Sequence, residues 1–227
     1  MISPIIIALD LDYEDSLEFA KKIDPKHCRL KVGSQLFTQK GPQIIEELSI
    51  LGFDIFLDLK FHDIPNTVAS AVEVASEMGV WMLNVHTSGG SKMMEAARLA
   101  ANKSANPPLV IGVTILTSLN QVDMNELGVK NISNQINDLA SLAHKSSLDG
   151  IVCSAGDVRN IKSLLGKDFL TITPGIRSIN AQKDDQSRIS SAKQAIEDGS
   201  DYLVIGRPIT QSSDPLKSLE IFLKEIG

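Results

Sequence analysis

The feature that most constrains the fold is a pattern that recurs along the whole chain: a short apolar run, a polar tip and a helix-like stretch. The apolar runs cover residues 5–9, 28–32, 54–60, 80–85, 109–115, 150–153, 169–172 and 202–205. Short runs rich in Val, Ile and Leu are typical of parallel strands that are buried on both faces. The pattern therefore predicts an α/β protein with a parallel sheet covered by helices.

The segments between these runs have the character of helices. We expect helices at residues 13–23, 35–51, 67–79, 91–102, 132–147, 158–164 and 187–198, with residues 215–226 closing the chain. Eight strand–helix units favour a closed (β/α)8 TIM barrel, and an open doubly wound sheet is the alternative. The chain has 227 residues, which suits a compact barrel, so we expect residues 1–227 to form a single domain.

Composition and charge narrow the possible functions. The formal net charge of -6 argues against general nucleic-acid binding, so an anionic ligand would need locally placed cations. Cys28 and Cys153 form neither a disulfide framework nor a metal-ligand cluster, and we interpret them as packed, reduced thiols. The sequence has no run of about 18 apolar residues and no basic segment leading into an apolar one at its N-terminus. We therefore expect a cytoplasmic protein that binds no membrane.

Polar residues gather where the predicted strands end, which is where barrels of this class carry their functional groups. Two lysines, three carboxylates and two arginines occur at or just beyond these tips. They are Lys31, Lys60, Asp10, Asp58, Asp63, Arg177 and Arg207. Such a set of charges would suit a small, highly anionic ligand.

The central stretch is the end of the third predicted strand. Asp58 and Lys60 are two residues apart, so in an extended strand both side chains point to the same side. Asp63 lies just beyond the strand, within sequence reach of this pair. A lone Asp-x-Lys is also compatible with an ordinary surface ion pair, so these residues alone leave that alternative open.

The last two strand tips suggest a phosphate site. Pro174 and Gly175 open a turn of small residues, and Gly206 would let backbone N–H groups approach an oxyanion beside the Arg207 guanidinium. Residues 177–186 between these tips are polar and lack apolar periodicity. This stretch is interpreted either as a mobile lid over the site or as a plain surface loop.

The ten residues 58–67, DLKFHDIPNT, closely resemble the signature of the orotidine 5'-phosphate decarboxylase family, which catalyses the last step of UMP synthesis. The resemblance extends over most of the chain. It includes residues 8–10, 30–33, 173–177 and 204–208. A ten-residue match is specific, whereas the shorter Asp-x-Lys-x-x-Asp core also occurs in related sugar-phosphate enzymes.

This resemblance implies roles for individual residues in the decarboxylation of orotidine 5'-monophosphate to UMP. The implied catalytic residues are Lys31, Asp58, Lys60 and Asp63, with Lys60 as the proton donor. The implied substrate-binding residues are Asp10 for the ribose, Thr117 for the pyrimidine, and Arg177, Gln186, Gly206 and Arg207 for the phosphate, together with Lys31 and Thr67. The resemblance also implies a homodimer in which Asp63 and Thr67 serve the neighbouring subunit's site. It implies no metal and no organic cofactor.

Two other functions remain open from the sequence. One is a hexulose-phosphate synthase or a related enzyme of the same structural group, which would use the carboxylates to hold a divalent metal. The extended match over residues 58–67 and the presence of Lys31 argue against it. The other is a barrel that senses a nucleotide without converting it.

Overall fold

The computed structural model describes residues 3–177 and 190–227. In this part of the chain, eight parallel strands close into a barrel in sequence order, and β8 returns to pair with β1. The strands are β1 (Ile5–Ala8), β2 (Arg29–Gly33), β3 (Ile55–Phe61), β4 (Met82–His86), β5 (Leu109–Val113), β6 (Gly150–Val152), β7 (Leu170–Thr173) and β8 (Tyr202–Ile205). The predicted (β/α)8 TIM barrel is therefore confirmed, and closure excludes the open doubly wound sheet.

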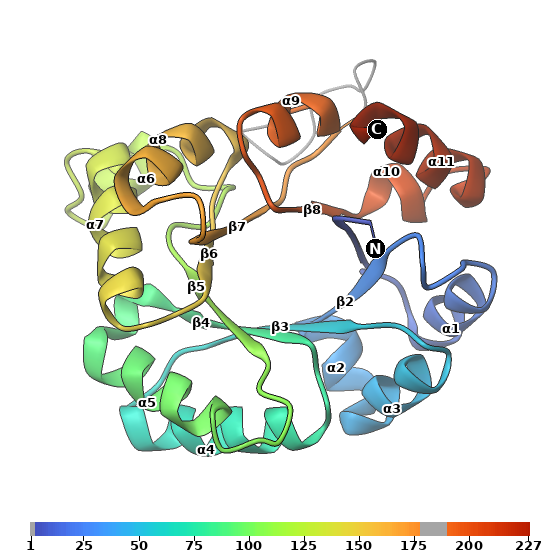
Figure 1. Cartoon of the computed structure of the whole chain (residues 1–227), viewed down its shortest axis with the longest axis horizontal. Coiled ribbons are helices and arrows are strands. Elements are labelled where there is room, and N and C mark those ends of the chain that lie inside the picture. The colour runs from blue at the N-terminus through green and yellow to red at the C-terminus, as the bar shows by residue number, and fades with distance from the viewer. Residues whose placement is uncertain (1–2, 178–189) are drawn as a thin grey trace.

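Helices form a ring around these strands (Figure 1). Those of the described residues are α1 (Tyr13–Lys21), α2 (Ser34–Lys40), α3 (Pro42–Ile50), α4 (Pro65–Glu77), α5 (Ser91–Ala101), α6 (Gln121–Glu126), α7 (Ile132–Lys145), α8 (Ala155–Leu165), α9 (Ala192–Glu197), α10 (Arg207–Thr210) and α11 (Pro215–Ile226). A 3-10 turn, Thr87–Gly89, follows β4. None of these helices has the length and apolarity needed to cross a bilayer.

Several predicted helix ends shift by up to three residues, as at α8, which begins at Ala155 rather than at residue 158, and three larger corrections are needed. The helix expected at 35–51 is two helices, because Gly41 has a φ of 58° and Pro42 starts a new helix directly after it. The helix expected at 187–198 begins only at Ala192, since Ser191 acts as its N-cap; residues 187–189 lie outside the described residues. The short helices α6 and α10 were not predicted, because neither is long enough to show apolar periodicity.

The barrel interior is packed with apolar side chains, as expected for this fold. They are Ile6, Ala8, Phe56, Met82, Ile111, Ile172 and Val204. At the end where the strands begin, the Arg29 guanidinium lies 4.2 Å from the centre of the Trp81 ring and 5.4 Å from that of Tyr202. These three side chains cover the N-terminal mouth of the barrel, whereas a cavity opens at the C-terminal ends of the strands.

Candidate active site

A cavity of about 280 Å³ lies at the C-terminal ends of the strands. Its floor contains Ala8, Phe56, Val152, Ile172 and Val204, which also belong to the barrel interior. Of the residues that the sequence placed in a site, eight line this cavity. They are Asp10, Lys31, Asp58, Lys60, Thr117, Arg177, Gly206 and Arg207. Strand tips that are far apart in the sequence thus meet around one space, because all eight strands run in the same direction.

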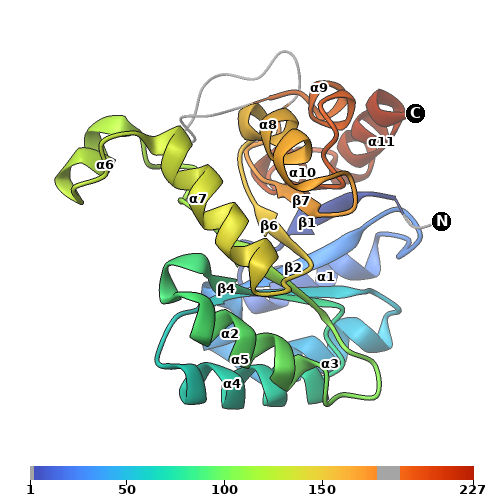
Figure 2. The same cartoon turned by 60° about the vertical axis from the view of Figure 1, so that its left-hand side comes forward.

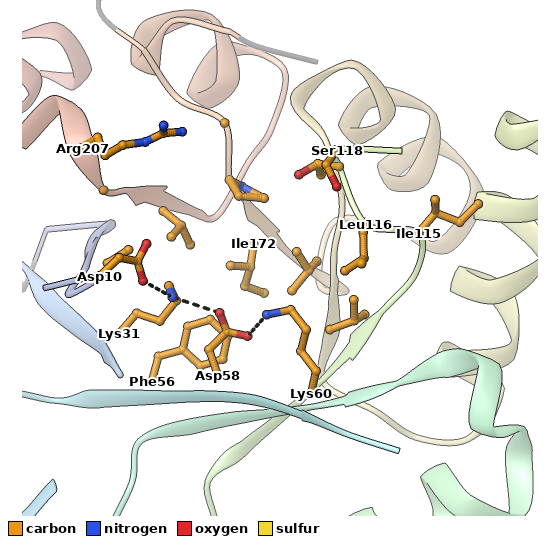
Figure 3. A pocket seen from close by; sticks show the side chains of 18 of the residues that line it. Asp10, Lys31, Phe56, Asp58, Lys60, Ile115, Leu116, Ser118, Ile172 and Arg207 are labelled. Atoms are coloured by element: carbon orange, nitrogen blue, oxygen red, sulfur yellow. Dashed lines mark hydrogen bonds and ion pairs between the residues drawn. The ribbon is translucent and has the colours of Figure 1, made fainter. Parts of the chain in front are cut away.

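Four side chains form a row of alternating charge along one side of the cavity (Figure 3). Lys31 Nζ lies 3.3 Å from Asp10 Oδ1 and 3.1 Å from Asp58 Oδ2. On the other side of the same carboxylate, Lys60 Nζ lies 2.6 Å from Asp58 Oδ1. The predicted contact between Asp58 and Lys60 is therefore present, and Asp58 lies between two ammonium groups.

Burial and charge act against each other on this row. Burial alone would raise the pKa of Asp58, but the neighbouring Lys31 and Lys60 lower it to about 2. Burial alone would lower the pKa of Lys31, yet the carboxylates of Asp58 and Asp10 more than offset this and raise it. Asp58 and Lys31 consequently both stay charged at neutral pH, although each is buried.

Space for the Lys31–Asp10 pair depends on a glycine in the same strand tip. A Cβ atom at Gly33 would come within 3.2 Å of Lys31 Nζ and 3.6 Å of Asp10 Oδ1. A larger side chain at this position would therefore press on the ion pair. This gives Gly33 a local role that its place in the sequence alone did not reveal.

Asn84 is a site residue that the sequence analysis missed. Its Nδ2 donates a hydrogen bond of 2.7 Å to Asp58 Oδ1, and its Oδ1 accepts one of 2.8 Å from the backbone N–H of Lys60. Asn84 lies in β4 and is completely buried. The sequence does show an Asn in the predicted strand that follows the Asp-x-Lys strand. This Asn could be recognised as a site residue only once the pairing of β3 with β4 was known.

Cations from the last two strand tips line another part of the cavity. Arg207 follows Gly206 at the end of β8, and Arg177 follows the turn after β7. In Figure 3 the Arg207 side chain lies across the cavity from Lys60. Gln186 and most of the stretch interpreted as a lid, residues 178–186, lie outside the described residues.

Two predicted residues do not line the cavity of their own chain. Asp63 is exposed, and its Oδ1 accepts a hydrogen bond of 2.6 Å from the backbone N–H of Ile64. Thr67 lies in the first turns of α4 and is exposed as well. Asp63 thus lies outside the lining of its own chain's cavity, although it is within sequence reach of the Asp58–Lys60 pair.

The donor set around Asp58 does not resemble a metal site. Its two oxygen atoms are in contact with the ammonium groups of Lys31 and Lys60, which occupy the positions where a cation would bind a carboxylate. Within residues 3–177 and 190–227, no three His, Cys, Asp or Glu side chains are grouped as metal ligands. The chemistry that this arrangement offers is that of a fixed positive charge and a transferable proton.

Comparison with known proteins agrees with this geometry. Residues 3–222 match the model of the Orotidine 5'-phosphate decarboxylase / HUMPS family. The chain belongs to this family. The predicted enzyme class, a carboxy-lyase, is thereby confirmed, because curated orotidine 5'-phosphate decarboxylases also match over nearly the full length.

Two of these relatives show how close the similarity is. The orotidine 5'-phosphate decarboxylase of Nitrosomonas eutropha is 55% identical over 226 residues, which cover 99% of this chain and 97% of that protein. The one from Saccharophagus degradans is 53% identical over 225 residues, covering 98% and 94%.

Solved structures of the family have the same barrel. The orotidine 5'-phosphate decarboxylase of Lactobacillus acidophilus has 37% sequence identity and a TM-score of 0.88, covering 99% of both chains. That of Pyrococcus horikoshii has 23% identity and a TM-score of 0.79, covering 98% of both, and supports the fold alone.

Proposed function

We propose that this chain converts orotidine 5'-monophosphate to UMP and CO2, the last step of de novo UMP synthesis. The observation that carries the proposal is the row Asp10, Lys31, Asp58 and Lys60 in a cavity that Arg207 lines on another side. A nucleotide that carries a carboxylate on its base and a phosphate on its ribose needs cations at two separate places. The names of the similar decarboxylases support the same substrate.

Lys60 is the proposed proton donor. Loss of CO2 from C6 of the pyrimidine leaves an sp2 carbanion that cannot delocalise into the ring π system, so the protein must stabilise it electrostatically. The Lys60 ammonium, held 2.6 Å from Asp58, offers a positive charge at a fixed position and then the proton that completes UMP. In this reaction the C6–CO2 bond breaks, its electron pair stays on C6, and a C6–H bond forms with a proton from Nζ.

The other charged residues of the row have separate proposed roles toward the substrate and toward each other. Asp58, with a pKa of about 2, stays ionised and faces the carboxylate of the bound substrate, which destabilises the ground state relative to the transition state. Lys31 is the proposed partner that keeps Asp58 charged in its buried position. Asp10, which is the more exposed end of the row, binds the ribose hydroxyls.

The remaining binding residues act on the base and the phosphate. Thr117 is the proposed contact of the pyrimidine, and it is buried in the cavity wall after β5. Arg177, Gly206 and Arg207, together with Gln186, form the proposed phosphate site. Binding energy from a phosphate remote from C6 can then be used for closure and for exclusion of water.

We also propose that the active unit is a homodimer that shares its sites. Asp63 and Thr67 are exposed outside their own cavity, as residues that complete a neighbouring site would be. Ile64, next to Asp63 in the chain, is an apolar side chain that is 66% exposed, and Val122 and Leu127, on and after α6, are 69% and 70% exposed; exposed apolar side chains of this size are candidates for burial in a dimer. Figure 2 shows α6 projecting beyond the barrel wall.

We further propose one functional domain over residues 1–227 and a cytoplasmic location.

The metal-dependent alternative requires a carboxylate that is free to bind a cation. Both oxygen atoms of Asp58 instead contact ammonium groups, which favours the metal-independent reaction. We accordingly propose that no metal and no organic cofactor takes part.

An assay of CO2 release from orotidine 5'-monophosphate in excess EDTA distinguishes the candidates. The proposal predicts full activity after prolonged dialysis against chelator. CO2 release that is lost in EDTA and restored by Mg²⁺ would contradict the metal-independent reaction. Binding of UMP without any CO2 release would identify a nucleotide sensor.

A further inference from the structure

The third strand is irregular where it carries the central lysine. Leu57 pairs with Leu83 and Phe61 with Val85, so three residues of β3 face a single residue of β4, which is Asn84. Lys60 lies within this bulge. Its backbone φ is 52°, which is in the left-handed region that residues other than glycine rarely adopt. A regular strand would therefore place the Lys60 ammonium differently.

The Asn84 side chain bonds to the backbone of β3 within this bulge. Its Oδ1 accepts the N–H of Lys60, and its Nδ2 donates to Asp58 Oδ1, the same oxygen that contacts Lys60 Nζ. One amide thus bonds to the backbone of Lys60 and to its carboxylate partner at the same time. An amide is suited to this because it offers an acceptor and a donor side by side.

We propose that Asn84 is a positioning residue that holds the bulge and sets the Lys60 ammonium against Asp58 in the orientation used for protonation. Asn84 does not line the cavity, so it acts through Lys60 and Asp58 rather than on the substrate. This inference rests on the proposed function of Lys60. It predicts that loss of the amide lowers kcat while substrate binding is largely retained.

The first test is Asn84→Leu, which keeps the approximate size and removes both hydrogen bonds. With orotidine 5'-monophosphate as substrate, kcat should fall at least about tenfold, and KM and the Kd for UMP should change less than about threefold. Thr171→Val is the matched control, because Thr171 is a fully buried polar residue of β7 that bonds to Asp201 away from the cavity. Its kcat should stay within about twofold of the wild type.

Asn84→Asp gives a second test that a merely structural role would not satisfy. A neutral carboxylic acid at this position can donate to Asp58 as the amide does, whereas an ionised one cannot and repels it. The titratable groups around it are Asp58 and Lys60 of β3, to which Asn84 bonds, and His86 of β4, whose pKa is lowered by burial and also responds to His62, Lys60 and Asp58; the β5 residue paired with Asn84 is Ile111. Repulsion by Asp58 is expected to raise the pKa of the new acid, so it should ionise between about pH 5 and 9.

The decisive quantity is the ratio of Asn84→Asp to wild-type kcat, measured across that pH range with folding checked by circular dichroism at each pH. We expect the ratio to fall about tenfold or more as the pH rises. A ratio independent of pH, or an Asn84→Leu variant with wild-type kcat, would overturn the positioning role. An inactive wild-type enzyme in the same assay would instead refute the proposed function, so the two failures are distinguishable.

Discussion

The ammonium Nζ of Lys60 lies 2.6 Å from Oδ1 of Asp58, and the backbone of the same lysine is in the left-handed region. A strained backbone beside a short ion pair is typical of a functional position, because the surrounding structure must keep the residue there. Here that structure includes Asn84 and the bulge of β3. The geometry therefore favours a lysine whose charge is fixed before any substrate binds.

Replacement of Arg207 tests the phosphate site. Arg207→Ala should lower kcat/KM for orotidine 5'-monophosphate by a few kcal/mol of transition-state stabilisation, since a charge-assisted contact to the phosphate is lost. The same change should barely affect the slow decarboxylation of orotidine, which lacks the phosphate. Lys103→Ala, which removes a cation of the Lys103–Glu73 surface ion pair, is the control. Equal losses on both substrates would show that Arg207 does not act through the phosphate.

Mixed dimers test whether Asp63 acts in the neighbouring site. Lys60→Ala and Asp63→Ala chains are unfolded and refolded together, with subunit exchange verified by mass. If Asp63 acts in trans, a mixed dimer has one site with both changes and one intact site. About half of the dimers are mixed, so activity should approach about a quarter of the wild type per site.

A matched mixture provides the control for this experiment. Lys60→Ala and Asp58→Asn both alter the same cavity of the same chain, because the two side chains are in direct contact. Every site of their mixed dimer keeps one change, and no activity should return. Absence of recovery in the Lys60→Ala and Asp63→Ala mixture as well would show that Asp63 works within its own chain or that the active unit is not this shared dimer.

The pKa of Asp58 predicts how stability depends on pH. Its folded value of about 2 lies below the ordinary value of 3.8, because Lys31 and Lys60 outweigh the effect of burial. A depressed carboxylate pKa contributes stability that is present above about pH 4 and is lost as the pH falls towards 2. The size of this contribution is on the order of 2 kcal/mol.

Urea unfolding of the wild type and of Asp58→Asn at pH 5 and pH 2 measures this contribution. At one protein concentration, the difference in the free energy of unfolding between the two proteins should shrink by about 2 kcal/mol on acidification. Asp138→Asn, which removes an exposed carboxylate of α7, is the matched variant for the loss of one surface charge. A difference that stays constant between the two pH values would contradict the assignment.

Much of the barrel could be predicted from the chain because its signals are local. The strand from Ile5 and the strand from Tyr202 are short apolar runs bounded by polar tips, and their positions were confirmed to within a residue. The contact between Asp58 and Lys60 was predicted from regular alternation along one strand and is present, although the bulge at Lys60 breaks that alternation. The break at Gly41 was also marked locally, by a Gly-Pro pair, but the helical pattern on both sides concealed it.

The parts that could not be predicted depend on pairing between distant segments. Asn84 reaches Lys60 only because β3 loses register against β4, and no local pattern reports a register shift. The position of Asp63 outside its own cavity likewise depends on the turn between β3 and α4. Sequence distance alone put Asp63 within reach of the Asp58–Lys60 pair and could not show whether it lines the cavity of its own chain.

The most direct test of the account is the turnover of Lys60→Ala on orotidine 5'-monophosphate in the presence of EDTA, compared with the wild type. Loss of a positioned acid alone lowers a rate by about 10²- to 10⁴-fold, and loss of the charge facing the carbanion adds to this. We therefore predict that the folded variant, which should still bind UMP, is nearly inactive while the wild type is fully active. A folded Lys60→Ala protein that kept more than about a tenth of wild-type kcat would contradict the central role of Lys60.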